Sequence, residues 1–294
     1  MNQSKKPSPS SFESGSGEGP TTSPSPTRRA LIAAPLAMLA TPAHAQPKAP
    51  PMTSQAKILA PTGPLRAAIN FGNPVLAQRA PDGTPQGVSV ALATELASRL
   101  GVPLAIVAYD QAGKVTDALP SGAPGLEPWD ICFLAKDPVR GKGIAFTDPY
   151  VLIEGGYAVP DAAPFTTVES VDAANVSIGV VRGSAYDLYL TRALKHAVLS
   201  RYDNNQAAGD ALISGAVPVL AGVKQPLAAL VAANPGHRMI PGRFMSIEQT
   251  MGTPNTRPAE AVAALQSFIA EMKSSGFIAK ALAATGQHDA EVAP

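Results

Sequence analysis

The chain has 294 residues and carries 23 Lys and Arg against 22 Asp and Glu, a formal net charge of +1 at pH 7. Hydrophobic residues make up 45% of it, enough to bury an ordered core, and the balanced charge excludes the broad electrostatic footprint of a nucleic-acid-binding protein. The single cysteine, Cys132, excludes an intrachain disulfide framework and zinc sites built from several cysteines.

Residues 1–45 are predicted to be a signal peptide and to lie outside the fold. A stretch rich in Ser, Pro and Gly leads to Arg28 and Arg29, then to an apolar run at 30–40 and a small-residue site ending at Ala45. Basic, apolar and small-residue regions in this order are typical of a secretory signal, so cleavage after Ala45 and export to the periplasm are expected. The arginine pair also resembles a twin-arginine signal, and both this route and the general secretory route stay open.

The mature chain is predicted to start with a tether and then a strand and a helix. Residues 46–64 are rich in Pro, Ala and Thr and are interpreted as a flexible tether. The short apolar run at 65–69 ends in a Gly and Pro turn signal and predicts a buried strand. A helix over 89–100 is predicted next, because Ser89 is a suitable N-cap, leucines recur every four residues and Gly101 follows the last turn.

The elements that follow form two series of strands and helices. The strand–helix–strand order predicts largely parallel strands, and two such series in one chain predict two lobes with a cleft between them. The first series continues with a strand at 104–107, a helix at 113–119 and a strand at 131–134. The second series has strands at 176–181, 217–220 and 239–240 and helices at 185–196 and 206–213. A further helix is predicted at 259–272.

Few residues carry a recognisable catalytic or metal-binding pattern. The histidines of the mature chain are far apart, and no nucleotide, metalloprotease or hydrolase motif occurs in it, so neither a cofactor nor a metal is predicted. Cys132 lies in an apolar strand and is interpreted as a packed, inert thiol. Gly183 and Ser184 end a strand and open a helix, where free backbone N–H groups favour an anion. Ser184 capping its own helix is an equally good interpretation.

Blocks of sequence spread along the mature chain resemble the family 3 extracellular solute-binding proteins of ABC importers. The most specific are Asp137-Pro138-Val139-Arg140 and Phe146-Thr147-Asp148-Pro149-Tyr150, and residues 87–93 and 183–185 fit the same order. The resemblance implies an α/β protein with a type II periplasmic binding protein fold, in which two lobes are joined by a two-segment hinge. Lobe 1 is expected at 65–157 plus 247–286, lobe 2 at 158–246 and a tail at 287–294.

The resemblance also implies a ligand site. Arg140 matches the arginine that binds a ligand carboxylate, and Gly183, Ser184 and the amide of Ala185 match the groups that complete that subsite from the other lobe. Phe71 and Asn73 fall in the first ligand loop, although Asn73 stands where an aromatic residue is usual.

The acid that usually receives the ligand ammonium is missing, because Ala221-Gly222-Val223-Lys224 occupies that region. An unpaired ammonium in a closed cleft is costly. Either another acid serves, with Glu154 the first candidate and Glu248 the second, or the ligand has no amine.

The expected function is therefore that of a periplasmic binding protein. It would be a monomer that binds a polar amino acid or related organic acid and presents it to an ABC permease, with no nucleic-acid partner and no cofactor. Two alternatives stay open: a periplasmic dehydratase-like enzyme on the same fold, with Glu154 or Glu248 as its acid, and a ligand-sensing module.

Overall fold

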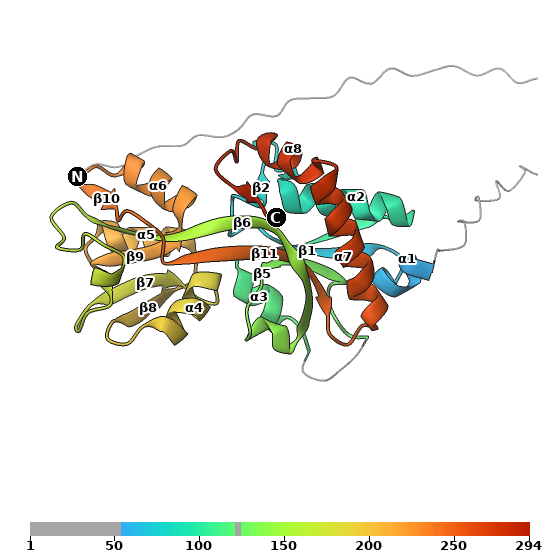
Figure 1. Ribbon diagram of the computed structural model, residues 1–294, viewed down its shortest axis with the longest axis horizontal. Coiled ribbons are helices and arrows are strands. Elements are labelled where there is room, and N and C mark those ends of the chain that lie inside the picture. Colours follow the sequence, from blue (N-terminus) through green and yellow to red (C-terminus); the bar gives the residue numbers. More distant parts are fainter. Residues whose placement is uncertain (1–53, 121–124) are drawn as a thin grey trace, which may run out of the picture. The chain divides into compact units, whose positions relative to one another are not determined.

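The computed structural model describes residues 54–120 and 125–294, which are organised around a ten-stranded mixed sheet (Figure 1). Its main strands in spatial order are β4 (Leu104–Tyr109), β1 (Leu65–Asn70), β5 (Ile131–Ala135), β11 (Met245–Pro254), β6 (Ile144–Pro160), β9 (Val219–Val223), β7 (Ser177–Val181) and β8 (Val198–Tyr202). The short strands β10 (His237–Met239) and β12 (Glu291–Val292) also pair with β6. A separate hairpin joins β2 (Gln78–Arg79) to β3 (Pro85–Gln86).

Two sets of parallel strands are joined by an antiparallel pair. In the first lobe β1 pairs in parallel with β4 and β5, and in the second lobe β7 pairs in parallel with β8 and β9. Between them β6 and β11 pair antiparallel along most of the length of β11, and Figure 1 shows them side by side as they pass from one lobe to the other. Two α/β lobes connected by two crossing segments confirm the predicted architecture.

Helices cover both faces of the first lobe because its strands are apolar on both faces. Ile69 and Phe133 face a core that α2 (Val88–Leu100), α7 (Ala259–Ser274) and α8 (Phe277–Ala283) complete. The alternate residues Ala68 and Cys132 face a smaller cluster, which includes Trp129 and Val115 of α3 (Ala112–Asp117). This continuous apolar pattern is typical of parallel strands buried on both sides.

The second lobe has its own core. It is formed by buried residues of β7 and β9 together with α4 (Ala185–Ala193), α5 (Asn205–Ile213) and α6 (Lys224–Ala233). Tyr157, Ala158 and Val159 at the far end of β6 belong to this core, whereas Tyr150, Val151 and Ile153 of the same strand belong to the first. A single strand thus contributes to both lobes.

Two helix predictions need correction at their ends. The helix predicted to begin after Ser89 is α2, and it begins after Gly87. Gly87 has φ 118° and lies so close to the preceding loop that a Cβ there would be 2.4 Å from the Leu76 oxygen. Ser89 is instead buried within α2, where its hydroxyl bonds the Tyr150 hydroxyl. The helix predicted to reach 196 ends at Ala193, since the following amides, among them those of residues 195–197, donate to the Asp172 carboxylate.

The predicted tether and tail are also shorter than expected. Within the tether, α1 (Ser54–Leu59) packs against α7, with Ala56 and Leu59 in the first core. In the predicted tail, β12 pairs with Leu152 and Val151 of β6. Both segments carry a few apolar residues that the fold buries, although neither is periodic enough to be recognised in the sequence.

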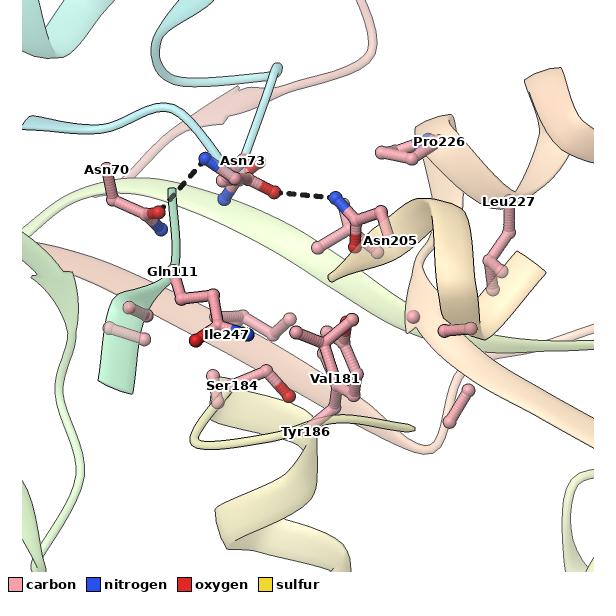
Figure 2. A pocket seen from close by; sticks show the side chains of 18 of the residues that line it. Asn70, Asn73, Gln111, Val181, Ser184, Tyr186, Asn205, Pro226, Leu227 and Ile247 are labelled. Atoms are coloured by element: carbon pink, nitrogen blue, oxygen red, sulfur yellow. Dashed lines mark hydrogen bonds between the residues drawn. The ribbon is translucent and has the colours of Figure 1, made fainter. Parts of the chain in front are cut away.

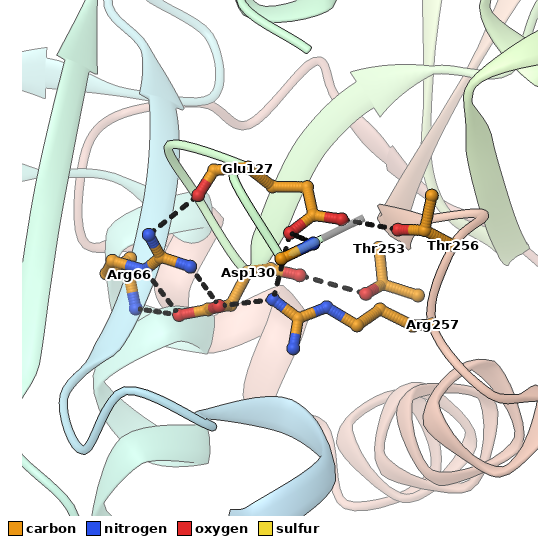
Figure 3. Close-up of polar contacts among 7 residues, drawn as sticks. Arg66, Glu127, Asp130, Thr253, Thr256 and Arg257 are labelled. Carbon is orange, nitrogen blue, oxygen red and sulfur yellow. Dashed lines mark hydrogen bonds and ion pairs between the residues drawn. The ribbon is translucent and has the colours of Figure 1, made fainter. Parts of the chain in front are cut away.

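A buried ionic cluster secures the first lobe at the amino ends of its strands (Figure 3). The Asp130 side chain is fully buried and accepts hydrogen bonds from Arg66 Nε and Nη2 at 3.1 and 2.7 Å and from Arg257 Nη2 at 2.8 Å. Thr256 donates to the nearby Glu127 carboxylate. The cluster connects β1, β5 and the segment after β11, and it lies at the opposite end of the strands from the cavity described next.

Candidate functional site

A cavity of about 320 Å³ lies between the two lobes. The first lobe contributes Asn70 at the end of β1 and Gln111 before α3, and the second contributes Val181 at the end of β7 and Asn205 at the start of α5 (Figure 2). Loops at the carboxyl ends of parallel strands converge there, which is the usual place for a ligand in an open α/β sheet.

Arg140 is the cation of this cavity. It follows β5, and its side chain is buried: Nη1 donates to the Ala135 oxygen and Nη2 to the Gly183 oxygen, both at 2.9 Å. Within the described residues it makes no ion pair, and its buried Nε has no hydrogen-bond partner. Burial lowers the pKa of the guanidinium to about 10, so it remains a cation at neutral pH. The structure therefore brings the predicted arginine to the cavity with hydrogen-bonding capacity left over.

The second lobe places the start of α4 next to Arg140. Ser184 and Ala185 line the cavity, and Gly183, with φ 68°, contributes its carbonyl to Arg140 but is not among the lining residues. The Ser184 hydroxyl accepts from the Asp187 amide at 3.0 Å and so caps its own helix. Its capping role is thus observed, and the Ala185 amide lies in the first turn, where helical N–H groups favour an anion.

Gln111 also lines the cavity, although no sequence motif predicted it. It precedes α3, its side chain is 7% exposed, and its Nε2 is buried without a partner in the described part of the chain. Figure 2 shows the side chain extending into the cavity between Ser184 and Ile247. A glutamine among polar residues has no sequence signal of its own; only its position after a strand could have suggested it.

Of the two residues predicted in the first ligand loop, one lines the cavity and the other does not. Asn73 lines the cavity together with Asn70, whose side-chain oxygen accepts from the Gly72 amide at 3.0 Å. Phe71 does not line it: its ring packs against the first core and lies 4.3 Å from the Arg79 guanidinium carbon. The structure brings Asn73 to the cavity and leaves Phe71 outside.

An apolar wall closes the second-lobe side. It consists of side chains of β9 and α6 and the adjoining part of β11: Leu220, Ala221, Val223, Leu227 and Ile247. The region predicted to lack the usual acid is this wall, and Gly222 within it packs so closely that a Cβ would lie 3.1 Å from Leu227 Cγ.

The two acids proposed as ammonium partners lie elsewhere. Glu154 in β6 is bound by Lys224 and, at 2.7 Å, by Arg243, and the hydrogen bond from Lys224 holds its carboxyl pKa below the usual range. Glu248 in β11 is exposed. Neither residue is among those lining the cavity. Their placement gives no support to an ammonium-binding role.

Several contacts join the lobes around the cavity. Besides the bond from Arg140 to Gly183, Arg192 of α4 and Asp137 of the first lobe form an ion pair at 2.6 Å. Gly113 of α3 and Gly183 meet backbone to backbone, since a Cβ on Gly183 would lie 2.8 Å from the Gly113 Cα. The lobes thus touch where the start of α3 meets the start of α4.

Other chemistry is sparse in residues 54–120 and 125–294. They contain no group of three or more His, Cys, Asp and Glu that could hold a metal ion, and no helix long and apolar enough to cross a membrane. Cys132 is fully buried in β5, and burial raises the pKa of its thiol. This confirms the prediction that the cysteine is packed in the core.

Comparison with known proteins gives one family. The model of the bacterial extracellular solute-binding proteins, family 3, matches residues 65–285, nearly the whole folded part of the chain. No curated protein sequence matches significantly.

Solved structures show the same fold. A mutant of ArgBP from T. maritima is 22% identical with a TM-score of 0.66, covering 79% of this chain and 99% of its own. The solute receptor for L-cysteine of Neisseria gonorrhoeae is 23% identical with a TM-score of 0.66, covering 79% and 93%. An ancestral amino acid-binding protein, described as a precursor of cyclohexadienyl dehydratase, is 20% identical with a TM-score of 0.64, covering 79% and 99%. These similarities confirm the predicted type II periplasmic binding protein fold.

Proposed function

The chain belongs to the family 3 bacterial extracellular solute-binding proteins, and we propose that it is the periplasmic binding component of an ABC importer for a small carboxylate-bearing solute. The observation that carries this proposal is Arg140, a guanidinium buried at the interlobe cavity with a free Nε. A carboxylate fits the planar guanidinium fork and supplies the negative charge that the buried cation lacks. The first turn of α4 would add backbone donors from the other lobe.

Binding would be completed by closure of the lobes. β6 and β11 are the segments between them, so a hinge in these strands would open and close the cavity, and the permease would distinguish the closed form. The exported protein would be a monomer. It would begin at Gln46, because the signal peptide would be cleaved after Ala45. N-terminal sequencing of protein recovered from the periplasm tests this, and finding Arg28 and Arg29 still attached would contradict it.

The ligand class is tested by a thermal-shift screen of small carboxylates and amino acids, followed by calorimetry on the hits. A ligand that binds the native state raises its melting temperature by mass action. Arg140→Ala should reduce affinity about tenfold to a hundredfold, because a hydrogen bond to a charged group contributes about 1.5–3 kcal/mol. Arg140→Lys should also bind weakly, since an ammonium cannot reproduce the fork. Unchanged affinity in both variants would place the ligand away from Arg140.

Enzymatic activity on the same fold needs a separate test, since one structural neighbour is described as a precursor of a dehydratase. The acids that could act in this way, Glu154 and Glu248, lie outside the cavity lining. Asp110, which does line it, is paired with Lys114 at 2.8 Å. We expect cyclohexadienyl acids to be recovered unchanged after incubation; an aromatic product formed over many turnovers would identify an enzyme.

A further inference from the structure

Two residues that line the cavity each carry a buried N–H donor without a partner in the described part of the chain. Arg140 Nε and Gln111 Nε2 are the unsatisfied buried side-chain atoms among the residues that line it in the described chain. Both side chains are more than nine-tenths buried, Arg140 at 2% and Gln111 at 7% exposure. A buried donor without an acceptor is unfavourable, so a ligand oxygen that accepts from either group would stabilise the complex. The cavity therefore offers hydrogen-bond donors for two ligand oxygens, one at Arg140 and one at Gln111.

The acids around the cavity are already engaged by the protein. Asp110 is the acidic residue that lines it among the described positions, and its carboxylate is paired with Lys114 and mostly exposed. Glu154, behind the apolar wall, is held between Lys224 and Arg243. A ligand ammonium would thus enter a site that already contains one buried cation and would find no unpaired carboxylate there.

The remaining residues that line the cavity favour contact with an apolar part of a ligand. Val223, Leu227 and Ile247 contribute apolar side chains to the lining. Val223 is also the N-cap residue of α6, and no side-chain hydrogen bond caps that helix. A ligand body without charge can bury apolar surface against this wall, whereas an ammonium would lose its hydration without compensation.

We propose that the solute is a carboxylic acid without an amino group, with its carboxylate at Arg140, a second oxygen accepting from Gln111 and an apolar body against the β9–α6 wall. This inference rests on the proposed function and narrows its ligand class. A 2-oxo or 2-hydroxy acid with a branched or aromatic body has this set of groups.

The primary test is calorimetry of the full-length mature protein with matched pairs. Each pair is a 2-oxo acid and the amino acid of the same carbon skeleton: 2-oxobutanoate, 4-methyl-2-oxopentanoate and phenylpyruvate against 2-aminobutanoate, leucine and phenylalanine. We expect the oxo acid of the best-binding pair to bind at least tenfold more tightly. Equal or tighter binding of the amino acid would overturn the inference while leaving the proposed function intact. If no member of any pair and no other carboxylate binds, the proposed function itself fails.

A pair of substitutions at Val223 isolates the effect of charge. Val223→Asp and Val223→Asn both introduce a short polar side chain that can cap α6, so the fold should tolerate both, and they differ in one negative charge. Relative to the Asn variant, the Asp variant should bind the oxo acid more weakly and the amino acid more tightly, shifting their affinity ratio at least tenfold. An identical ratio in the two variants would show that the ligand does not lie against this wall and would overturn the inference.

Discussion

Replacing Gly113 by Ala should weaken ligand binding without weakening the ligand-free protein. Gly113 is the second residue of α3 in the first lobe and meets Gly183 of the second. A Cβ on Gly113 would lie 3.3 Å from the Gly183 Cα and 3.6 Å from the Arg182 oxygen. In this structure, where the two lobes touch, the added methyl group is therefore crowded by backbone, which cannot rotate away. With the lobes apart the same methyl group would meet only solvent.

The magnitude follows from the two states. Carbon atoms pack best at about 3.5–4.0 Å, so the lobes must separate by a few tenths of an ångström. Overpacking of this kind costs about 1–3 kcal/mol, which corresponds to a loss in affinity of about fivefold to 150-fold. In the open protein Ala is favoured over Gly in a helix by up to about 1 kcal/mol, so the melting temperature should rise by up to about 2–4 °C. Stability and affinity are expected to move in opposite directions.

Calorimetry and thermal unfolding of three variants test this reasoning. Gly183→Ala should weaken both properties, because a Cβ there would lie 2.8 Å from the Gly113 Cα and Gly183 has φ 68°, which disfavours any side chain. Gly143→Ala is the control, since its Cβ would meet only Leu119 Cδ1 at 3.5 Å and should leave affinity unchanged. If Gly113→Ala binds as tightly as wild type, the two glycines do not meet in the liganded protein and the closure argument is wrong.

Three further outcomes are expected. Arg192→Gln should weaken ligand binding by up to about fivefold, because the ion pair between Arg192 and Asp137 joins the lobes and the partial exposure of the guanidinium limits its strength. This loss of affinity should shrink at high salt, and a loss that does not depend on salt would exclude an ionic cause. Gln111→Leu should weaken oxo-acid binding because it removes the donor, and Gln111→Glu should weaken it further because it also adds a repelling charge. Unchanged affinity of Gln111→Leu in calorimetry would exclude Gln111 as a donor. Asp130→Ala should destabilise the protein by about 3–5 kcal/mol in denaturant titration, because it leaves Arg66 without its buried partner, and the refolded fraction should keep normal affinity. A loss of affinity without a loss of stability would connect this cluster to the ligand site.

Local patterns were sufficient to predict most of the fold. The strand at Leu65, the helix ending at Gly101 and the strand at Ile131 depend on apolar runs and turn residues within a short window. The start of α2 was misplaced by two residues, because the close approach of Gly87 to the Leu76 carbonyl is a tertiary contact that no local sequence pattern reveals. The long strands β6 and β11 were predicted only as the two segments of a hinge, since their pairing connects residues about a hundred positions apart.

The site was predicted where chemistry and family resemblance coincide. Arg140 and Ser184 belong to sequence blocks that identify the family, and the structure brings both to one cavity. Gln111 was missed because a single amide side chain acquires meaning only when its neighbours leave it buried and unpaired. Glu154 was proposed because it is an acid close to the expected boundary between the lobes. The cations that engage it, Lys224 and Arg243, come from other parts of the chain. Charge complementarity between distant segments is a property of the folded chain.

Alkylation of the buried cysteine can be used to measure unfolding of this protein. Cys132 is fully enclosed in the first lobe, so a thiol reagent can reach it only in molecules that have opened this core, and no second thiol competes for the label. At constant reagent, the alkylation rate would follow the fraction of opened molecules. A bound solute lowers that fraction in proportion to its occupancy, and protection of one thiol could therefore rank candidate solutes in unpurified mixtures without any engineered probe.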